Sequence, residues 1–171
     1  MRSASFRLHT ALCVTAFLLL LATFAPASTA QSTGVGLGGQ IGVSNAGPNP
    51  VGLTLKTWTS DQQAIQAATS FVISDEEAGL SYWVIQGDYV FHDFEQVTVG
   101  DGLMALYVGP GLQITFIENS DANIALRAPL GVSYMFGDAP IDVFAEVAPT
   151  LQIEQAPQLR FDGAIGFRYY F

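Results

Sequence analysis

The chain has 171 residues, of which 50% are apolar and only 12% are charged, and its formal net charge at pH 7 is −9. This length suits one domain, and the composition is too apolar for a disordered chain. With 6 basic residues against 15 acidic ones, the chain lacks the basic surface that nucleic-acid binding requires, so that class of partner is excluded.

The first 30 residues have the three parts of a secretory signal peptide. Two arginines precede an apolar run at residues 11–21, which is too short to span a membrane as a helix, and small residues at 28–30 offer a cleavage site before Gln31. Without these arginines, four basic side chains remain against 15 acidic ones, a net charge of −11. We therefore expect a signal peptide at residues 1–30 and one mature domain at residues 31–171.

The single cysteine, Cys13, lies within the apolar run. Leu12 precedes it and is larger than the small residue that lipoprotein processing sites carry, so we expect no lipid anchor. The mature chain is then expected to have no disulfide and no thiolate chemistry.

Beyond residue 30 the sequence contains eight segments in which apolar and polar residues alternate. Successive side chains of a strand point to opposite faces, so this pattern predicts strands with one apolar face and one polar or small face. The third segment is the weakest, because its alanine-rich stretch also suits a helix. The predicted strands cover residues 35–43, 51–58, 63–73, 80–91, 103–116, 123–136, 141–154 and 159–171.

Eight such strands predict an all-β fold, an eight-stranded antiparallel up-and-down transmembrane β-barrel. A tilted strand of about ten residues can cross a bilayer, and an even strand number places both termini on one side. The alternative is a soluble barrel that turns its apolar face inward and binds a lipid. Three observations favour the membrane barrel: small residues crowd the polar face, lysine is nearly absent, and aromatic residues lie near strand ends. The predicted inner rim comprises Phe91, Tyr134, Phe136, Tyr169 and Phe171, and the predicted outer rim Phe71, Trp83, Phe116 and Phe161.

The polar face carries a few charged residues, which must be paired or hydrated inside a lumen. In a hairpin of the last two strands, one register places Glu154 opposite Arg160. The same register places Glu146 opposite Arg168, so it forms two opposite-charge pairs.

Pairing of the second, third and fourth strands is predicted to form a layer of Lys56, Gln66 and Asp88. Arg127 is expected to lie against Gly109 or Gly111, where there is room for it. We expect these side chains to fill the lumen and specify the fold, with solute binding as the alternative. The predicted polar network comprises Lys56, Gln66, Asp88, Arg127, Glu146, Glu154, Arg160 and Arg168.

No combination of residues points to catalysis. His92, the only histidine of the mature chain, lies at the inner end of the fourth strand beside Asp93 and is expected to be a polar rim residue. Catalysis by a nucleophile needs an orienting base, and a metal site needs several ligands; neither set is complete around His92. We therefore expect no enzymatic activity, no cofactor and no metal.

Pro110, Pro129 and Pro149 interrupt the fifth, sixth and seventh strands near their middles. Proline cannot donate to the hydrogen-bond ladder, so these positions predict bulges that bend the wall. The alternative is a weak seam through which a lipid or apolar molecule passes sideways, by analogy with the proline-flanked openings of a palmitoyl-transferring barrel enzyme.

The last predicted strand alternates Ile165, Phe167, Tyr169 and Phe171 with small or polar residues. It resembles the closing strand of bacterial outer-membrane β-barrels. The resemblance implies that these four residues form the signal read by the barrel-assembly machinery.

Three stretches carry a wider resemblance: G-L-T-L-K-T-W at 52–58, A-P-I-D-V-F-A-E-V-A-P at 139–149 and D-G-A-I-G-F-R-Y-Y-F at 162–171. With them the chain resembles small outer-membrane proteins of the OmpA-like and opacity-like kind, and more closely a family of uncharacterised bacterial barrels. We expect a protein among outer-membrane lipids with a structural or envelope-maintenance role. The alternatives are a narrow channel or lateral conduit for small or apolar molecules, and the soluble lipid-binding barrel.

Overall fold

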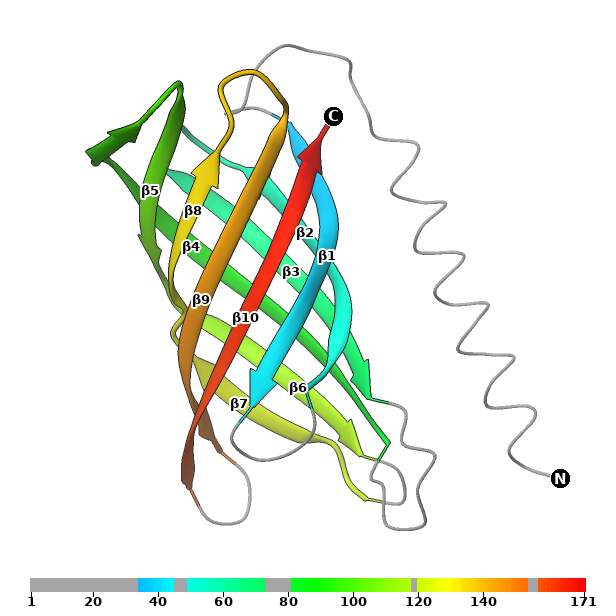
Figure 1. Ribbon diagram of the computed structural model, residues 1–171. Coiled ribbons are helices and arrows are strands. Elements are labelled where there is room, and N and C mark those ends of the chain that lie inside the picture. The colour runs from blue at the N-terminus through cyan, green and yellow to red at the C-terminus, as the bar shows by residue number, and fades with distance from the viewer. Residues whose placement is uncertain (1–33, 45–48, 73–80, 118–119, 154–156) are drawn as a thin grey trace, which may run out of the picture.

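The structure is a computed structural model that describes residues 34–44, 49–72, 81–117, 120–153 and 157–171. The predicted signal peptide and Glu154 lie outside these residues. The described chain contains no helix long and apolar enough to cross a membrane. It forms one antiparallel sheet that closes on itself, with the end of the last strand beside the first strand (Figure 1).

Ten strand segments make up the wall. The pairs Val108 with Leu130 and Gly111 with Arg127 belong to one uninterrupted register, so β5 continues into β6 and β7 into β8. The wall therefore has the eight strands that the alternating pattern predicts, and the pairing of β10 with β1 closes it. The segments are β1 Val35–Ser44, β2 Val51–Trp58, β3 Gln63–Val72, β4 Tyr82–Val99, β5 Gly102–Val108, β6 Gly111–Ile117, β7 Asn123–Arg127, β8 Leu130–Met135, β9 Ile141–Gln152 and β10 Gln158–Tyr170.

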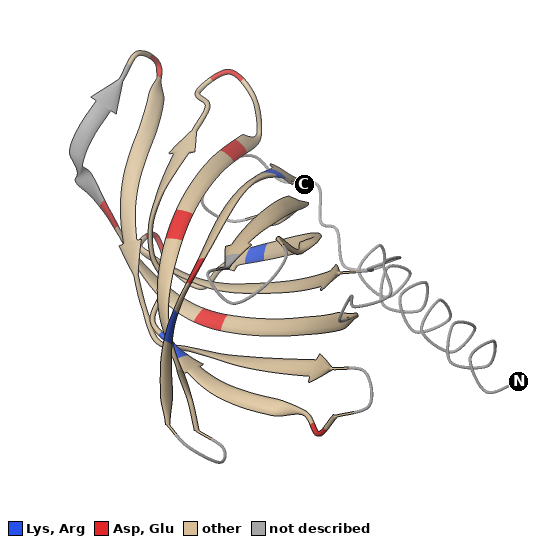
Figure 2. Cartoon of the chain, turned by 60° about the horizontal axis from the view of Figure 1, so that its bottom comes forward, with Lys and Arg blue, Asp and Glu red and all other residues tan. Residues whose placement is uncertain are grey.

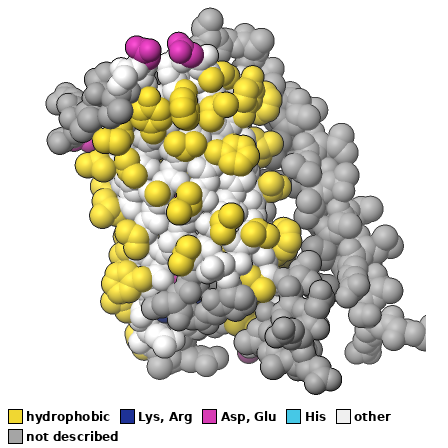
Figure 3. Space-filling model, in the orientation of Figure 1, with side chains coloured by type: hydrophobic (Ala, Val, Ile, Leu, Met, Phe, Trp, Pro, Cys, Tyr) yellow, Lys and Arg dark blue, Asp and Glu magenta, His cyan; other side chains and the backbone are white. Residues whose placement is uncertain are grey.

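The apolar face of every strand points away from the barrel axis. On β10, for example, Ile165 is 64% exposed, whereas its neighbour on the other face, Ala164, is 5% exposed. The basic residues of the described chain all lie in strands, on β2, β7 and β10 (Figure 2). Apolar side chains cover the outer wall (Figure 3). A soluble barrel would bury that face, so the alternative with inverted faces is wrong.

Aromatic side chains gather near both ends of the outer surface. We call the end where Val35 and Tyr170 lie the terminal end. At the opposite end, Trp83 is paired with Phe71 on one side and with Phe116 on the other. Such belts are expected where a barrel meets the lipid headgroups. Nearer the terminal end, edge-to-face couples recur two residues apart on three strands, at Tyr89 and Phe91, Tyr134 and Phe136, and Tyr169 and Phe171.

Strand β4 is longer than the sequence predicts. It continues to Val99 and turns at Gly100, whose φ of 62° is readily adopted by glycine, into β5 at Gly102. Its pairing with β5 shifts between Asp93 and Val97, which is the one register shift among the described strands. The β4–β5 hairpin therefore extends beyond the beginning of β3, where Gln63 pairs with Phe91, while β8 follows β5 as far as Leu103 (Figure 1).

The three prolines leave the register unchanged, so the prediction of bulges at these positions is wrong. Pro110 and Pro129 fall in the gaps that divide the fifth and sixth strands, and Pro149 lies inside β9. Each proline lacks its own N–H, but its carbonyl still accepts a bond from the preceding strand, so the wall stays closed. These bonds run from Tyr89 N to Pro110 O at 2.9 Å, Gly109 N to Pro129 O at 3.2 Å and Ala128 N to Pro149 O at 3.1 Å.

Candidate functional site inside the barrel

The pairing of β2, β3 and β4 forms the predicted layer. Lys56 lies opposite Gln66, and Gln66 lies opposite Asp88, to which its amide donates a bond of 3.2 Å. Arg127 lies opposite Gly111. A Cβ at Gly111 would lie 1.8 Å from the Asp88 carboxylate, so the glycine makes room for an acid rather than for Arg127 alone.

The register of β9 and β10 differs from the prediction by four residues. Arg168 lies opposite Asp142, and Glu146 lies opposite Ala164, so the predicted pairing of Arg168 with Glu146 is wrong. A shift of four residues keeps every side chain on its own face, so the alternating pattern fits both registers equally well. The buried bond between Arg168 Nη1 and Asp142 Oδ2, at 3.2 Å, belongs to the observed register.

One cluster of buried polar groups lies toward the terminal end. Lys56 is fully buried, and its Nζ donates to His92 Nε2 at 2.7 Å and lies 3.9 Å from Asp142 Oδ2. The Asp142 carboxylate also accepts bonds from Arg168 at 3.2 Å and from the Tyr170 hydroxyl at 3.0 Å. His92 is 4% exposed, so the expectation of a polar rim residue is wrong: this side chain is part of the interior.

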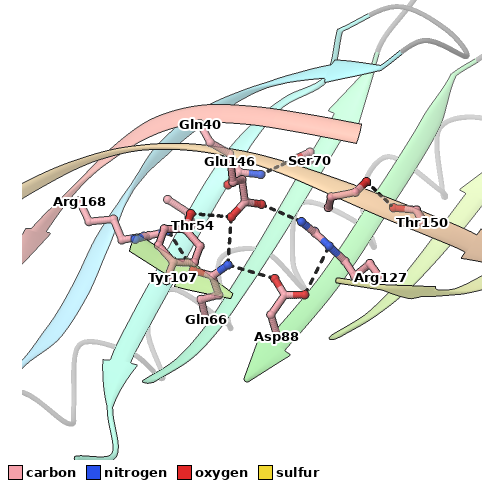
Figure 4. A network of polar contacts seen from close by, with 11 residues as sticks. Gln40, Thr54, Gln66, Ser70, Asp88, Tyr107, Arg127, Glu146, Thr150 and Arg168 are labelled. Atoms are coloured by element: carbon pink, nitrogen blue, oxygen red, sulfur yellow. Dashed lines mark hydrogen bonds and ion pairs between the residues drawn. The ribbon is translucent and has the colours of Figure 1, made fainter. Parts of the chain in front are cut away.

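A second cluster centres on Glu146, near the middle of β9. Arg127 Nη2 donates to Glu146 Oε1 at 2.7 Å, and Arg127 Nε lies 3.4 Å from Asp88 Oδ1. Tyr107 and Gln66 both donate to Glu146 Oε2, at 2.8 and 3.1 Å. Figure 4 shows these side chains converging inside the barrel from several different strands.

Gln66 joins the two clusters. Its carbonyl accepts a bond of 3.4 Å from Arg168, while its amide nitrogen donates to Asp88 and Glu146. The formal charges of the joined network cancel, as buried charges require, because desolvation of an unpaired ion is costly. The three basic members are Lys56, Arg127 and Arg168, and the three acidic members are Asp88, Asp142 and Glu146.

Aromatic rings close the space around this network. The His92 ring lies between those of Trp58 and Tyr107, with centroids 4.5 and 5.2 Å away. Lys56 Nζ lies 4.4 Å from the Trp58 ring, and the Arg168 guanidinium lies 3.8 Å from the Phe144 ring. Cations over ring faces are stabilised when both are buried. We call the two clusters and these rings the plug.

Glycines on the lumen face leave room for the rings of the plug. A Cβ at Gly131 would lie 2.3 Å from the Tyr107 ring, and one at Gly166 would lie 2.6 Å from the Phe144 ring. The glycines that mark the polar face in the sequence therefore leave space for large side chains from neighbouring strands. Sequence reasoning expected sparing filling but did not identify these ring partners, because Tyr107 faces Gly131 and Phe144 faces Gly166 only in the observed strand registers.

The opposite half of the lumen is open. A cavity of about 120 Å³ lies between the ends of β1 and β3 and the beginnings of β4 and β10. Arg160, predicted as part of the network, lines this cavity instead of the plug. The described residues contain no group of three His, Cys, Asp or Glu side chains arranged to hold a metal ion. The other polar side chains of the lining include Gln40, Ser70, Gln86, Gln113, Thr115, Arg127, Glu146 and Asp162.

The predicted assembly-signal residues lie on the outer surface. Ile165, Phe167 and Tyr169 alternate on β10 and are exposed, as is Phe171, which follows the strand. The backbone of Phe171 donates to the Val35 carbonyl at 3.1 Å, so this end of the chain is held against β1.

Comparison with known proteins identifies the architecture. The structure is similar to the N-terminal β-barrel domain of Pseudomonas aeruginosa OprF, with a TM-score of 0.60 and 14% identity over 82% of this chain and 98% of that one. The fold is that of an eight-stranded outer-membrane β-barrel. Neisserial surface protein A has a TM-score of 0.49 at 14% identity, covering 80% of this chain and 94% of that one. Ail of Yersinia pestis has a TM-score of 0.39 at 12% identity, covering 81% of this chain and 99% of that one. No family model and no curated protein sequence matches the chain.

Proposed function

We propose that the protein is a structural component of the outer membrane whose lumen does not conduct ions and which carries out no catalysis. The observation that supports this most directly is the plug. Its charges are paired with one another, the Tyr107 and Phe144 rings lie against glycines, and the charged core is almost fully buried. The most deeply buried charged residues are Lys56, Asp142 and Arg168. An eight-stranded barrel has an interior just wide enough for side chains, and these side chains fill the half of it toward the terminal end.

Location in the outer membrane is supported by two features of the wall. Its outer surface is apolar, and aromatic residues lie near both ends of that surface. The partners of such a surface are lipids, and the exposed face of β10 is where the assembly machinery would bind. Fractionation of cells that produce the full chain tests this: the protein is expected with the outer membrane, and recovery from the soluble fraction would contradict it.

Conductance across a planar lipid bilayer tests the closed lumen. The purified barrel is expected to give no current steps, because ions would have to enter a space occupied by paired charges. A variant that combines Tyr107→Ala and Phe144→Ala removes two rings of the plug and is expected to conduct. The matched control is Phe91→Ala, which removes an exposed ring from the outer surface and is expected to stay silent.

Current steps from the unaltered protein would contradict the proposal and favour the narrow channel. If none of the three proteins gives current steps, the gel mobility of the protein recovered from the bilayer shows whether it was inserted as a folded barrel. The strand registers continue unbroken past all three prolines, so these positions give no support to a lateral conduit.

A further inference from the structure

We propose that the open half of the lumen binds an uncharged, hydroxylated solute of sugar-like chemistry. The cavity there measures about 120 Å³ and is lined from several strands, including β1, β3, β4, β6 and β10. Binding there does not require the barrel to conduct, because the cavity lies on the far side of the plug from the terminal end.

The lining is rich in groups that both donate and accept hydrogen bonds. Gln40 Nε2 donates to the Ser70 hydroxyl at 3.2 Å, and Gln113 Nε2 donates to the Thr115 hydroxyl at 3.4 Å. Each of these bonds uses one of the two N–H groups of an amide. The Gln86 amide, also on the wall, makes no hydrogen bond with any other side chain of the described residues. Amides with spare capacity match hydroxyl groups, which likewise donate and accept.

The charges of the cavity favour a neutral ligand. Arg127 is already paired with Glu146 at 2.7 Å, and the remaining charged residues of the lining are Arg160 and Asp162, one of each sign. The formal charges of the lining therefore cancel. An anion would compete with Glu146 and Asp162, and a cation would compete with the two arginines, whereas a polyhydroxylated molecule meets no such repulsion.

The cavity is closed on one side by the plug. Its wall residues on β1 and β3 lie near the ends of those strands, and those on β4 and β10 near their beginnings, so the cavity lies toward the end opposite the termini. On its other side lies the plug. A solute would therefore enter and leave through the same end, and the arrangement is suited to binding rather than passage.

Saturation-transfer NMR on the full chain tests the proposal, with the protein refolded in phosphocholine micelles that carry no sugar. The probes are D-glucose and N-acetyl-D-glucosamine. Inorganic phosphate and acetate are added as anionic competitors, and their binding is read from the loss of the sugar signal. Octyl glucoside added to the micelles presents the same sugar on a lipid anchor. This arm separates a free solute from the headgroup of a glycolipid.

The variants are Gln86→Leu and Gln113→Leu, each with the heat-dependent gel shift as a check on folding. Their matched control is Gln63→Leu, the same change near the terminal end, where the Gln63 carbonyl accepts a bond from Tyr89. We expect saturable sugar binding that each cavity variant weakens about three- to tenfold, the effect of one lost hydrogen bond, and that the control leaves unchanged.

Three results would overturn the proposal: no saturable signal from either the free sugars or octyl glucoside, a signal equal in all variants, or displacement of the bound sugar by phosphate or acetate. If a cavity variant does not fold, Thr115→Val is the second test at the same wall. Binding of octyl glucoside without binding of free glucose would retain the site and assign its ligand to a membrane glycolipid.

Discussion

Arg168 Nη1 on β10 lies 3.2 Å from Asp142 Oδ2 on β9, and both side chains are almost fully buried. The two residues are also directly opposite each other in the ladder. This pair therefore links the register of the closing strands to the charge balance of the interior. A shift of the register by four residues would place Glu146 opposite Arg168 and separate Arg168 from Asp142.

Replacing Arg168 by methionine is expected to lower the free energy of unfolding by about 3–5 kcal/mol, because Asp142 would be left buried with one cation fewer. The double variant Arg168→Met, Asp142→Leu is expected to recover only part of this loss, since the net charge of the network returns to zero but Lys56 loses its ion pair with Asp142. Urea unfolding of the refolded barrel in lipid vesicles measures both. The comparison variant is Arg160→Met, at a partly exposed position, with an expected loss of about 1 kcal/mol or less. Equal losses of unfolding free energy in Arg168→Met and Arg160→Met would contradict the idea that burial makes the Arg168 ion pair important.

Gly131 faces the Tyr107 ring, and Gly131→Ala is expected to destabilise the barrel by about 1–3 kcal/mol through overpacking. The control is Gly87→Ala on the outer surface, where a Cβ would have no atom within 4 Å. The double variant Gly131→Ala, Tyr107→Leu should lose less than the sum of the single changes, because the clash is removed. Unfolding midpoints in urea provide the measurement, and additive losses would rule out the proposed contact.

Deletion of Phe171 separates assembly from stability. If the exposed face of β10 is the signal for the assembly machinery, the deletion is expected to reduce insertion in cells while the purified chain still refolds into detergent. The measurement is gel mobility with and without boiling, on membrane fractions and on refolded protein. Phe161→Ala, an exposed ring at the other end of β10, is the control. Loss of the heat-dependent shift in refolded protein as well would assign Phe171 to folding instead.

Pro110→Ala is expected to change stability by no more than about 1 kcal/mol, because two effects oppose each other. The new N–H can return a bond to the Tyr89 carbonyl, while alanine increases the freedom of the unfolded chain. The Tyr89 N to Pro110 O bond exists already, so no change of register is expected. The measurement is the hydrogen-exchange rate of the Tyr89 amide, which is expected to stay unchanged. Faster exchange in the alanine variant would show that the proline itself stabilises the wall.

The sequence by itself determined which side of the wall each residue occupies. A strand alternates its side chains with a period of two, so the apolar positions of β10 and the polar positions of β2 could be assigned without coordinates. It also determined the alignment of Lys56 with Gln66, because the turn between β2 and β3 is short and leaves few registers. The alignment of Gln66 with Asp88 was predicted by extending a similar pairing to β3 and β4. The extension of β4 to Val99 was missed, since its pattern is interrupted where the register shifts after Asp93.

Only the tertiary structure decided which polar groups meet. Asp142 and Glu146 lie four residues apart on the same face of β9, so either could have been assigned to Arg168 from the pattern alone. Contacts such as Gln66 with Glu146 or Arg168 with Gln66 join strands that are not neighbours in the wall, and no local rule of sequence predicts them. They arise because closing eight strands forces large side chains into a narrow space, where unpaired charges are too costly to remain.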